Sequence, residues 1–235
     1  MLEVNGLVVR YGPVTAVNNI DLRVDKGSVM ALLGANGAGK SSLMKAISGL
    51  VPAAAGSIRI DGQDVTQMPA HERARLGLSH AMEGRRLFHR LTVEENLRVA
   101  WDFRKPAGSF KAALDAAYER FPALAERRHM AAGLMSGGQQ QMVVLSAALI
   151  HSPRYLLLDE PSLGLAPVIV QKIFSVIAEV CRGQGVTILL SEQVAALALS
   201  VSKDGCVMRR GSLVRTGTAD ELAADPELSA AYLGS

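Results

Sequence analysis

The stretch VMALLGANGAGKSS, residues 29–42, decides the fold class of this chain. Its first five residues are apolar on both faces, which is typical of a buried strand in a parallel sheet. Residues 34–41 then match the pattern G-x-x-x-x-G-K-[ST], and the SSLMKAISGL that follows has helical spacing. A strand, a glycine-rich loop and a helix in this order predict a phosphate-binding loop in an α/β protein.

This loop has the residue types needed to hold a nucleotide. Glycines let the backbone bend around a phosphate with its N–H groups pointing inward, and the N-terminus of the next helix favours an anion. Lys40 can reach the β- and γ-phosphates, and Ser41 can bind Mg²⁺. The loop residues expected to bind the nucleotide are Gly34, Ala35, Asn36, Gly37, Ala38, Gly39, Lys40, Ser41 and Ser42. A glycine-rich turn that binds nothing is the alternative, and the strand-to-helix placement argues against it.

A second buried strand, in YLLLDEP at residues 155–161, ends in two carboxylates. Ligands of open α/β sheets bind beyond the carboxyl ends of the strands, so both side chains are expected near the phosphate loop. We expect Asp159 to hold Mg²⁺, directly or through water, and Glu160 to orient and deprotonate an attacking water. Without a phosphate loop in the same chain, such a pair would more often be the ordinary start of a loop.

The composition is that of a folded globular protein. The chain has 235 residues, 49% of them hydrophobic, which is enough for one large α/β domain or two small ones. The net charge of +3 comes from scattered lysines and arginines; it supports a nucleic-acid partner only weakly and suits an anionic membrane surface equally well.

Cys181 and Cys206 have no metal-binding spacing, so a reducing compartment is favoured. We see no signal peptide and no apolar run of about 18 residues, and therefore expect a soluble, cytoplasmic protein.

Hydrophobic periodicity predicts an α/β core interrupted by helices. Alternation in NIDLRVD and GSIRIDG predicts a small antiparallel sheet near the start. From Tyr155 onward, YLLLD and VTILLS predict parallel strands around a helix at VIVQKIFSVIAEV, followed by a hairpin in GCVMRRGSLVRTG and short helices in DELAADPELSAAYLGS. We expect a single domain, with the core at residues 1–82 and 151–235 and a helical subdomain at 83–150.

The helical subdomain contains two recognisable helix starts. In LTVEENLRVA, Thr92 and Glu95 have the spacing of a capping box, and Ser136 is placed as the N-cap of a helix that runs through Leu149. Ser136 belongs to MSGGQ, where a hydroxyl, glycine N–H groups and a helix start together form an anion-binding nest. The phosphate loop is far away in sequence and already surrounds its phosphates, so this nest calls for a different anion or a different site.

GANGAGKS, MSGGQ and LLLDEP, in this order, resemble the motifs of ATP-binding cassette (ABC) proteins, the ATPases of ABC transporters. The resemblance implies a P-loop NTPase core with an antiparallel β subdomain and an inserted α-helical subdomain, and ATP and Mg²⁺ as cofactors. In that family two cassettes pack head to tail. The signature motif of one cassette, which is MSGGQ here, closes on the γ-phosphate held by the other. The implied signature contacts here are Ser136, Gly137, Gly138 and Gln139. A helix N-cap with an incidental glycine pair is the alternative.

The resemblance extends over essentially the whole chain. YGPVTAVNNIDLRVDKG, MEGRRLFHRLTVEENL, MSGGQQQM, LLLDEPSLGLAP, ILLSEQ and the ending AYLG are similar to the smaller of the two ATPase subunits that energise branched-chain amino-acid import. Tyr11 then falls at the position of the aromatic residue that stacks on adenine; an exposed tyrosine without that role is the alternative.

Two further site residues follow from the resemblance. Glu83 stands where most ABC proteins have a glutamine that contacts Mg²⁺ and water and senses the membrane partner, and this branch often has glutamate there. Gln193 stands where most have a histidine that contacts the γ-phosphate. Because glutamine cannot become cationic near neutral pH, we expect Gln193 to position groups and Glu160 to carry out the proton chemistry.

The chain also differs at several positions from the residues that are common in these branched-chain amino-acid ATPase subunits. Ala81 and Met82 replace a common Val-Pro, which would loosen the loop that carries Glu83. Ala147 stands where an arginine is usual, and Ser191 places a hydroxyl in a buried strand, where it needs a partner. These changes put full activity or the usual substrate in doubt more than nucleotide binding. The five histidines are expected to be surface or ordinary core residues, and Arg85 and Arg86 are expected to be solvated charges rather than site residues.

The resemblance implies partners as well as a reaction. We expect transmembrane permease subunits, a second ABC ATPase subunit of the same or a different kind, an extracytoplasmic solute-binding protein acting indirectly, and no nucleic acid. The location would be the cytoplasmic face of the inner membrane. Branched-chain amino acids are the expected cargo; urea, short amides and other amino acids stay open. A soluble ABC ATPase acting on nucleic acid or ribosomes is the main alternative, although such proteins usually have two cassettes, a coiled coil or basic arms. A non-catalytic regulatory cassette is the third.

Overall fold

The computed structural model describes residues 1–104 and 108–228 of the chain, apart from the side chain of Arg104. The C-terminal AYLG, residues 231–234, lies outside the described residues, as do the last residues of the segment for which terminal helices were predicted.

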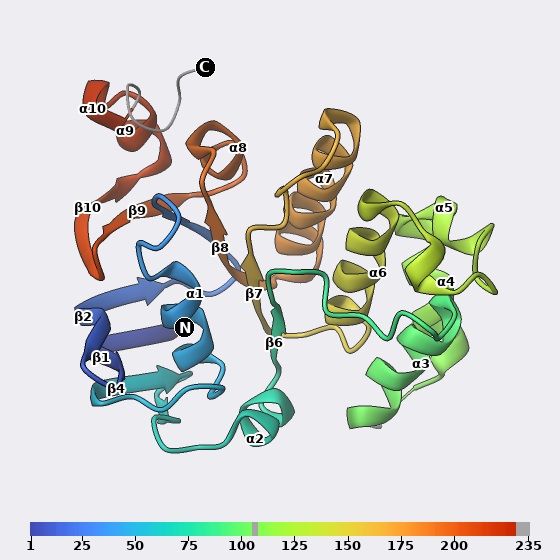
Figure 1. The fold of residues 1–235 in the computed structure, drawn as a ribbon, viewed down its shortest axis with the longest axis horizontal. Coiled ribbons are helices and arrows are strands. Elements are labelled where there is room, and N and C mark those ends of the chain that lie inside the picture. Colours follow the sequence, from blue (N-terminus) through green and yellow to red (C-terminus); the bar gives the residue numbers. More distant parts are fainter. Residues whose placement is uncertain (105–107, 229–235) are drawn as a thin grey trace.

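A six-stranded sheet in the order β10-β9-β3-β8-β7-β6 forms the centre of the molecule (Figure 1). Its strands are β3 (Val29–Leu33), β6 (Leu78–Ala81), β7 (Tyr155–Asp159), β8 (Thr187–Glu192), β9 (Asp204–Arg209) and β10 (Ser212–Thr218). All neighbours are parallel except β10, which forms a hairpin with β9. The predicted strands and hairpin are confirmed, whereas β6 was not predicted.

Both faces of this sheet are buried, which explains why β3 is apolar throughout. Val29, Ala31 and Leu33 face one hydrophobic cluster, and Met30 and Leu32 face another. The first cluster continues through α6 (Gly137–Leu149) and α7 (Pro167–Gln184) into the helical part of the chain, and the second contains α1 (Lys40–Ile47) and the antiparallel sheet. The strand is therefore fixed from both sides, and so is the loop that leaves it.

The antiparallel sheet predicted from alternation is present, in the order β2-β1-β4-β5. Its strands are β1 (Leu2–Tyr11), β2 (Val14–Val24), β4 (Ala55–Ile60) and β5 (Gln63–Asp64). In β2, Ile20, Leu22 and Val24 are buried while their neighbours are exposed, as the period of two requires. The two sheets are joined by a hydrogen bond of 2.8 Å from the Asn18 backbone N–H to the Gly211 carbonyl.

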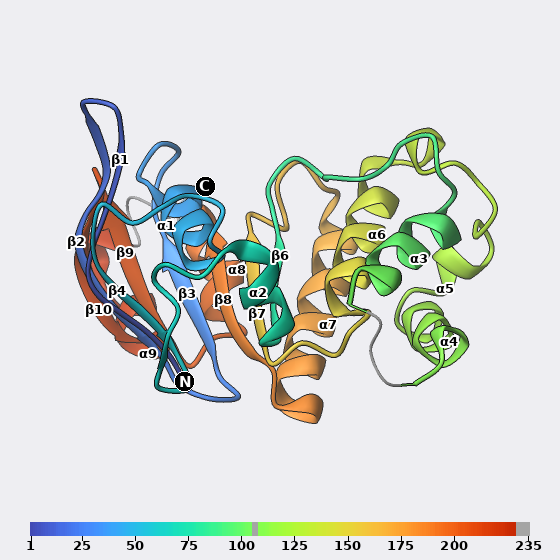
Figure 2. The same cartoon turned by 90° about the horizontal axis from the view of Figure 1, so that it is seen from below.

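Helices surround the parallel sheet, and several of them gather at one end of the molecule (Figure 2). The remaining helices are α2 (Ala70–Arg75), α3 (Val93–Arg104), α4 (Phe110–Arg120), α5 (Pro122–Ala125), the 3-10 turn η1 (Ala132–Leu134), α8 (Ala195–Leu199), α9 (Ala219–Ala223) and α10 (Pro226–Leu228). Helices α3 to α6 lie beside one another, at the opposite end from β1 and β2, and α7 lies between them and the sheet. In the described part of the chain, no helix combines the length and apolar character needed to cross a membrane.

The helix starts predicted from sequence are confirmed. The Glu95 backbone N–H donates to Thr92 Oγ1 at 3.1 Å, and the Thr92 N–H donates to Glu95 Oε2 at 2.7 Å, which completes a capping box before α3. Ser136 caps α6 in the same way, with Gln139 as its partner. Most apolar residues of α7 are also buried, among them Ile173, Phe174 and Ile177, whereas Val168 is exposed.

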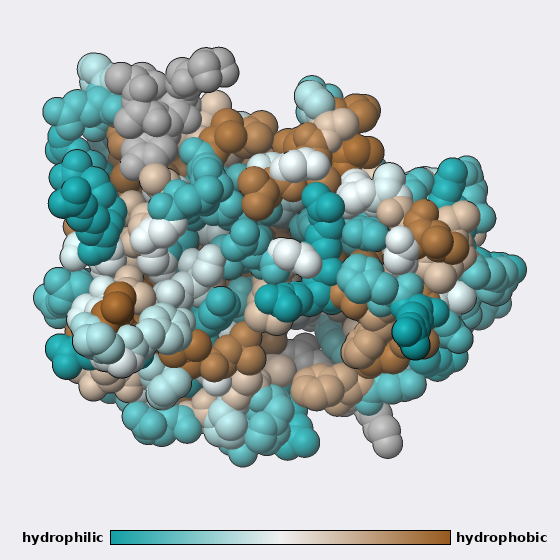
Figure 3. Space-filling view, viewed as in Figure 1, coloured by the Kyte–Doolittle hydropathy of each residue, from teal (hydrophilic) through white to brown (hydrophobic). Residues whose placement is uncertain are grey.

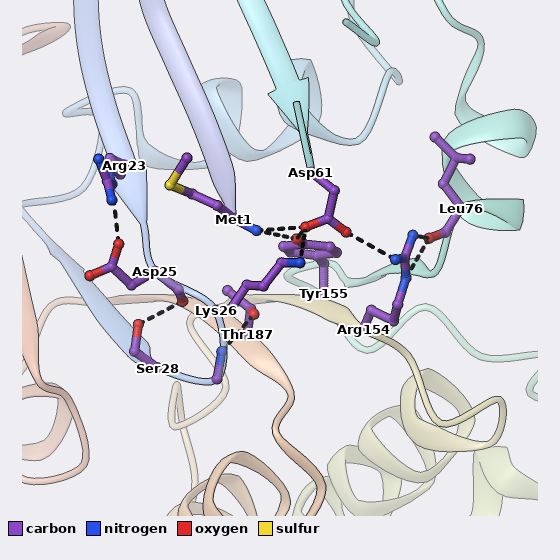
Figure 4. Close-up of polar contacts among 11 residues, drawn as sticks. Met1, Arg23, Asp25, Lys26, Ser28, Asp61, Leu76, Arg154, Tyr155 and Thr187 are labelled. Atoms are coloured by element: carbon purple, nitrogen blue, oxygen red, sulfur yellow. Dashed lines mark hydrogen bonds and ion pairs between the residues drawn. The ribbon is translucent and has the colours of Figure 1, made fainter. Parts of the chain in front are cut away.

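A cluster of charges around Asp61 ties the antiparallel sheet to the parallel one (Figure 4). The carboxylate lies 2.8 Å from the Met1 amine, 2.9 Å from Lys26 Nζ and 2.9 Å from Arg154 Nη1, and it accepts a hydrogen bond of 2.7 Å from the Tyr155 hydroxyl. Burial alone would raise the pKa of Asp61, but hydrogen bonds from the Met1 amine, Lys26 and Tyr155 outweigh it and hold the pKa well below its usual range.

Replacing Asp61 by Asn should destabilise the fold by about 1–3 kcal/mol at neutral pH, because three cations lose their common anion. Asn tolerates the left-handed backbone that Asp61 adopts, at φ 52°, so the change isolates the charge. The native pKa lies below that of the unfolded chain, so the deficit should persist above about pH 4 and shrink as the pH falls further. Urea unfolding at several pH values measures this. Asp25→Asn, at a more exposed ion pair with Arg23, should change stability by less than about 1 kcal/mol; an equal loss in both variants would contradict the prediction.

Candidate functional site

The loop between β3 and α1 wraps tightly against neighbouring backbone. Gly34, Gly37 and Gly39 all have positive φ angles. A Cβ atom at Gly34 would lie 2.5 Å from the Met208 carbonyl oxygen, and one at Gly39 would collide with the Ala16 carbonyl. Only glycine fits these positions, so the sequence forces a curled loop that ends at the uncapped N-terminus of α1.

A cavity of about 390 Å³ opens in front of this loop. Four other parts of the chain complete its wall: the start of β2 at residues 14–16, Glu83, Glu160, and the turn between β9 and β10 at residues 210–211. The predicted binding residues that line it are Asn36, Gly37, Ala38, Gly39, Lys40, Ser41 and Ser42. Tyr11 pairs with Val14 in the β1–β2 hairpin, is 44% exposed and is not part of the lining, so its contact with adenine stays a prediction.

Lys40 is buried at the base of this cavity, with its charge matched inside the protein. Its ammonium group donates to the Gly34 carbonyl at 2.6 Å and to the Ala35 carbonyl at 3.1 Å, and lies 3.0 Å from Glu160 Oε1. The side chains of Lys40 and Glu160 are only 3% and 5% exposed. A charge buried to this degree needs a partner of opposite sign, and Glu160 supplies it.

Gln193 links Glu160 back to the phosphate loop. Its Nε2 donates to Glu160 Oε2 at 2.7 Å and to Asn36 Oδ1 at 2.6 Å. The structure therefore brings together Asn36, Lys40, Glu160 and Gln193, four residues that lie in three distant parts of the sequence. Glu160 has a φ of 48°, a conformation costing about 1–2 kcal/mol that is fixed by hydrogen bonds from its N–H to the Ser191 carbonyl and hydroxyl.

Asp159 has one satisfied and one free carboxylate oxygen. Ser191 Oγ donates to Oδ1 at 2.6 Å, so the buried hydroxyl has the partner that the sequence required of it. Oδ2 is buried and has no hydrogen-bond partner. A buried carboxylate oxygen without a donor suits a cation, which fits the predicted Mg²⁺ ligand.

Glu83 lies between the phosphate-loop cavity and a second cavity of about 330 Å³. The second cavity is also lined by Asp159, Glu160 and Gln140, the last of these on α6. Glu83 and Glu160 thus line both cavities, and Asp159 lines the second.

Residues 136–139 stay apart from the phosphate loop. None of them lines the 390 Å³ cavity. Their polar groups are engaged locally, since Ser136 Oγ accepts from the Gln139 N–H at 3.3 Å and Gln139 Oε1 accepts from the Ser136 N–H at 3.1 Å. Within one chain, this tip and the loop do not form a common site.

Two contacts near the site were not expected from the sequence. Glu192 accepts hydrogen bonds from the Ser162 N–H at 3.0 Å and the Ser162 hydroxyl at 2.8 Å, and burial raises its pKa. A carboxylate at the end of a buried strand was the available signal, because it repeats the arrangement in YLLLDEP. Arg85, expected to be a solvated charge, is instead partly buried and donates to the Leu163 carbonyl at 3.2 Å.

Known proteins match the chain along its length. A family model described as ABC transporter matches residues 17–163. The chain is 42% identical to the high-affinity branched-chain amino acid transport ATP-binding protein BraG of Pseudomonas aeruginosa, and the match covers all of both sequences. It is 32% identical to BraF of the same organism, over all of this chain and 98% of BraF. It is 35% identical to the probable branched-chain amino acid transport ATP-binding protein LivF of Archaeoglobus fulgidus, over 94% of each.

Solved structures share the fold. A nucleotide-free ATP-binding cassette from an ABC transporter superposes with a TM-score of 0.85 at 25% identity, covering 100% of this chain and 99% of that one. The ADP conformation of an ATP-binding cassette of an ABC transporter gives a TM-score of 0.84 at 25% identity with the same coverage.

Replacing Ser191 by Ala should lower the free energy of unfolding by about 1–3 kcal/mol, because Asp159 loses its buried donor. Ser175→Ala is the matched control: that hydroxyl is exposed on α7 and bonds only to the Lys172 carbonyl, so the change should be within about 0.5 kcal/mol. Chemical denaturation of both variants measures the difference, and equal stabilities would contradict the prediction.

Proposed function

The chain belongs to the ABC transporter family of ATP-binding proteins, and we propose that it hydrolyses ATP to drive an importer of branched-chain amino acids. The observation that carries this proposal is the bonded set of Lys40, Glu160, Gln193 and Asn36 beside an open phosphate-loop cavity, in which Lys40 and Glu160 are buried. The full-length similarity to BraG supports the cargo class. The relatives favour a transporter over an ATPase that acts on nucleic acid.

A triphosphate would reorganise this set of residues. Lys40 would exchange Glu160 for the β- and γ-phosphate oxygens, because they offer a larger negative charge. Glu160 is then free to act as a base. Water attacks the γ-phosphorus, the bond from phosphorus to the bridging oxygen breaks, and Glu160 takes the proton that the water loses. Gln193, already bonded to Glu160, orients the water.

Asp159, Ser41 and Glu83 are the residues that would hold Mg²⁺. The free Asp159 Oδ2 fits this assignment, as do the positions of Ser41 and Glu83 on the wall of the phosphate-loop cavity. When bound, the ion neutralises charge on the phosphates.

A second ATPase subunit would complete the site. Residues 136–139 do not line this chain's own cavity, so their anion-binding tip is available to a nucleotide held by another subunit. ATP would hold two subunits together and hydrolysis would release them.

The permease subunits would dock on an apolar hollow on the face shown in Figure 3. This hollow has a volume of about 450 Å³ and lies between α2 and the end of α3. Its wall includes Leu50, Leu78, Met82 and Phe103, and Phe103 is 66% exposed. Large exposed apolar side chains around a hollow mark a protein contact. Because Met82 precedes Glu83, a partner seated here would act directly on the site. Residues 83–150, the helical subdomain, would move together with the docked permease. The complex would lie at the cytoplasmic face of the inner membrane. A solute-binding protein on the other side would act on it indirectly.

Replacing Glu160 by Gln should lower the hydrolysis rate about 100-fold or more while ATP still binds and links two subunits, because the shape is kept and the base is lost. Phosphate release and size-exclusion chromatography with ATP and Mg²⁺ measure the two effects. Glu179→Gln, an exposed carboxylate on α7, is the control and should hydrolyse normally. If Glu160→Gln turns over like the wild type, the assignment of the base is wrong.

Replacing Leu50 by Asp should abolish co-purification with membrane subunits and uptake of labelled leucine, while the isolated chain keeps its ATPase rate. A charge in an apolar contact is costly because it must lose its water. Val214→Asp places the same charge at a similarly exposed valine on β10 and should leave both unchanged. Normal uptake in the Leu50 variant would exclude the hollow as the docking site. Uptake of another solute in place of leucine would exclude the cargo class.

A further inference from the structure

Arg85 lies where three loops meet. It follows Glu83 by two residues, and its Nη2 donates to the Leu163 carbonyl at 3.2 Å, in the loop that follows Glu160. Its guanidinium also packs against the start of α6: a Cβ atom at Gly137 would lie 2.5 Å from Arg85 Nη1 and 3.0 Å from Cζ. The side chain therefore contacts both the loop after the catalytic carboxylate and the tip of the signature helix.

The backbone at Arg85 is built for this placement. Its φ of 48° is left-handed, a conformation that residues with a side chain rarely adopt. The glycine at 137 leaves the space that the guanidinium fills. Arg86, the next residue, is exposed. The two arginines thus lie in different environments, although the sequence alone does not distinguish between them.

Helix stability does not account for the contact. The N-terminus of a helix carries partial positive charge, so a guanidinium beside the start of α6 is electrostatically unfavourable. Among residues 1–104 and 108–228, no carboxylate lies within 4.0 Å of Arg85 to offset this. The carbonyl of Leu163 is its hydrogen-bond acceptor. A contact that works against the helix dipole calls for another role.

We propose that Arg85 is a positioning residue that couples the Glu83 loop and the loop after Glu160 to the signature tip. The three segments then move as one unit when the tip closes on ATP held by the second subunit, which rests on the function proposed above. Arg85 does not line the phosphate-loop cavity, so its loss should spare ATP binding by the single chain. It does line the cavity that contains Glu83, Asp159 and Glu160, so its loss should slow turnover.

The test compares Arg85→Ala, Arg85→Lys and Arg86→Ala in the full chain by steady-state ATP hydrolysis. We expect Arg85→Ala to lower kcat about 10-fold or more with KM changed less than 2-fold, and Arg86→Ala to match the wild type within 2-fold. Arg85→Lys should recover part of kcat, because lysine keeps the charge and can donate to the Leu163 carbonyl but lacks the planar fork of the guanidinium. If Arg85→Ala does not fold, Arg85→Gln keeps the aliphatic stem and serves in its place. A kcat equal to that of Arg86→Ala overturns the proposal.

A second measurement uses the Glu160→Gln background, where closure is read without turnover. We expect Arg85→Ala in this background to reduce the ATP-dependent dimer fraction several-fold relative to Arg86→Ala. Equal dimer fractions overturn the proposal. Failure of the proposed function looks different: Glu160→Gln alone would then hydrolyse ATP normally or show no dimer with ATP, whatever stands at position 85.

Discussion

A buried ammonium group cannot remain without a counter-charge, and this constraint governs the site. Strand β3 is buried on both faces, and the loop after it places Lys40 beyond the end of the strand. Gly34 and Gly39 in this loop have no room for a side chain. Glu160 supplies the negative charge, and it accepts a hydrogen bond from Gln193, which also donates to Asn36. In the proposed mechanism, Glu160 would stay paired with Lys40 until a phosphate group takes its place. Nucleotide binding and release of the proposed base would then follow from one exchange of partners.

The fold could be predicted wherever a local pattern has a single structural solution. The alternation in β2, the doubly apolar β3 and the capping boxes before α3 and α6 all depend on near neighbours in sequence. β6 and α2 were not predictable in this way. β6 is a four-residue edge strand containing His80, and α2 depends on Arg73, whose buried guanidinium bonds to the Ala46 and Ile47 carbonyls of α1. Contacts that far away in sequence leave no periodic trace.

The same distinction between local patterns and distant contacts decides which site residues could be predicted. The motif residues at Lys40 and Glu160 were predictable because strand ends of a parallel sheet meet at one edge, and they lie together in the structure. The contact of Arg85 with Leu163 joins residues 78 positions apart, in loops whose conformation is set by left-handed backbone angles. The contact of Glu192 with Ser162 is intermediate, because the place of Glu192 at the end of a buried strand was a signal, whereas its partner in the loop after Glu160 was not. Sequence spacing identifies which residues can act, whereas loop geometry decides what holds them.

The capping box at Ser136 has a consequence for recognition. A hydroxyl has lone pairs and a proton, and the cap uses only a lone pair, to accept from the Gln139 N–H. The proton stays free to be donated outward, so an arriving phosphoryl oxygen can be bound without unwinding the first turn. The conformational entropy of this turn is therefore lost when the chain folds, and not when the turn meets a phosphate group. In the proposed dimer, the tip would act as a preformed donor, and its affinity for the phosphate would depend on how the two subunits meet.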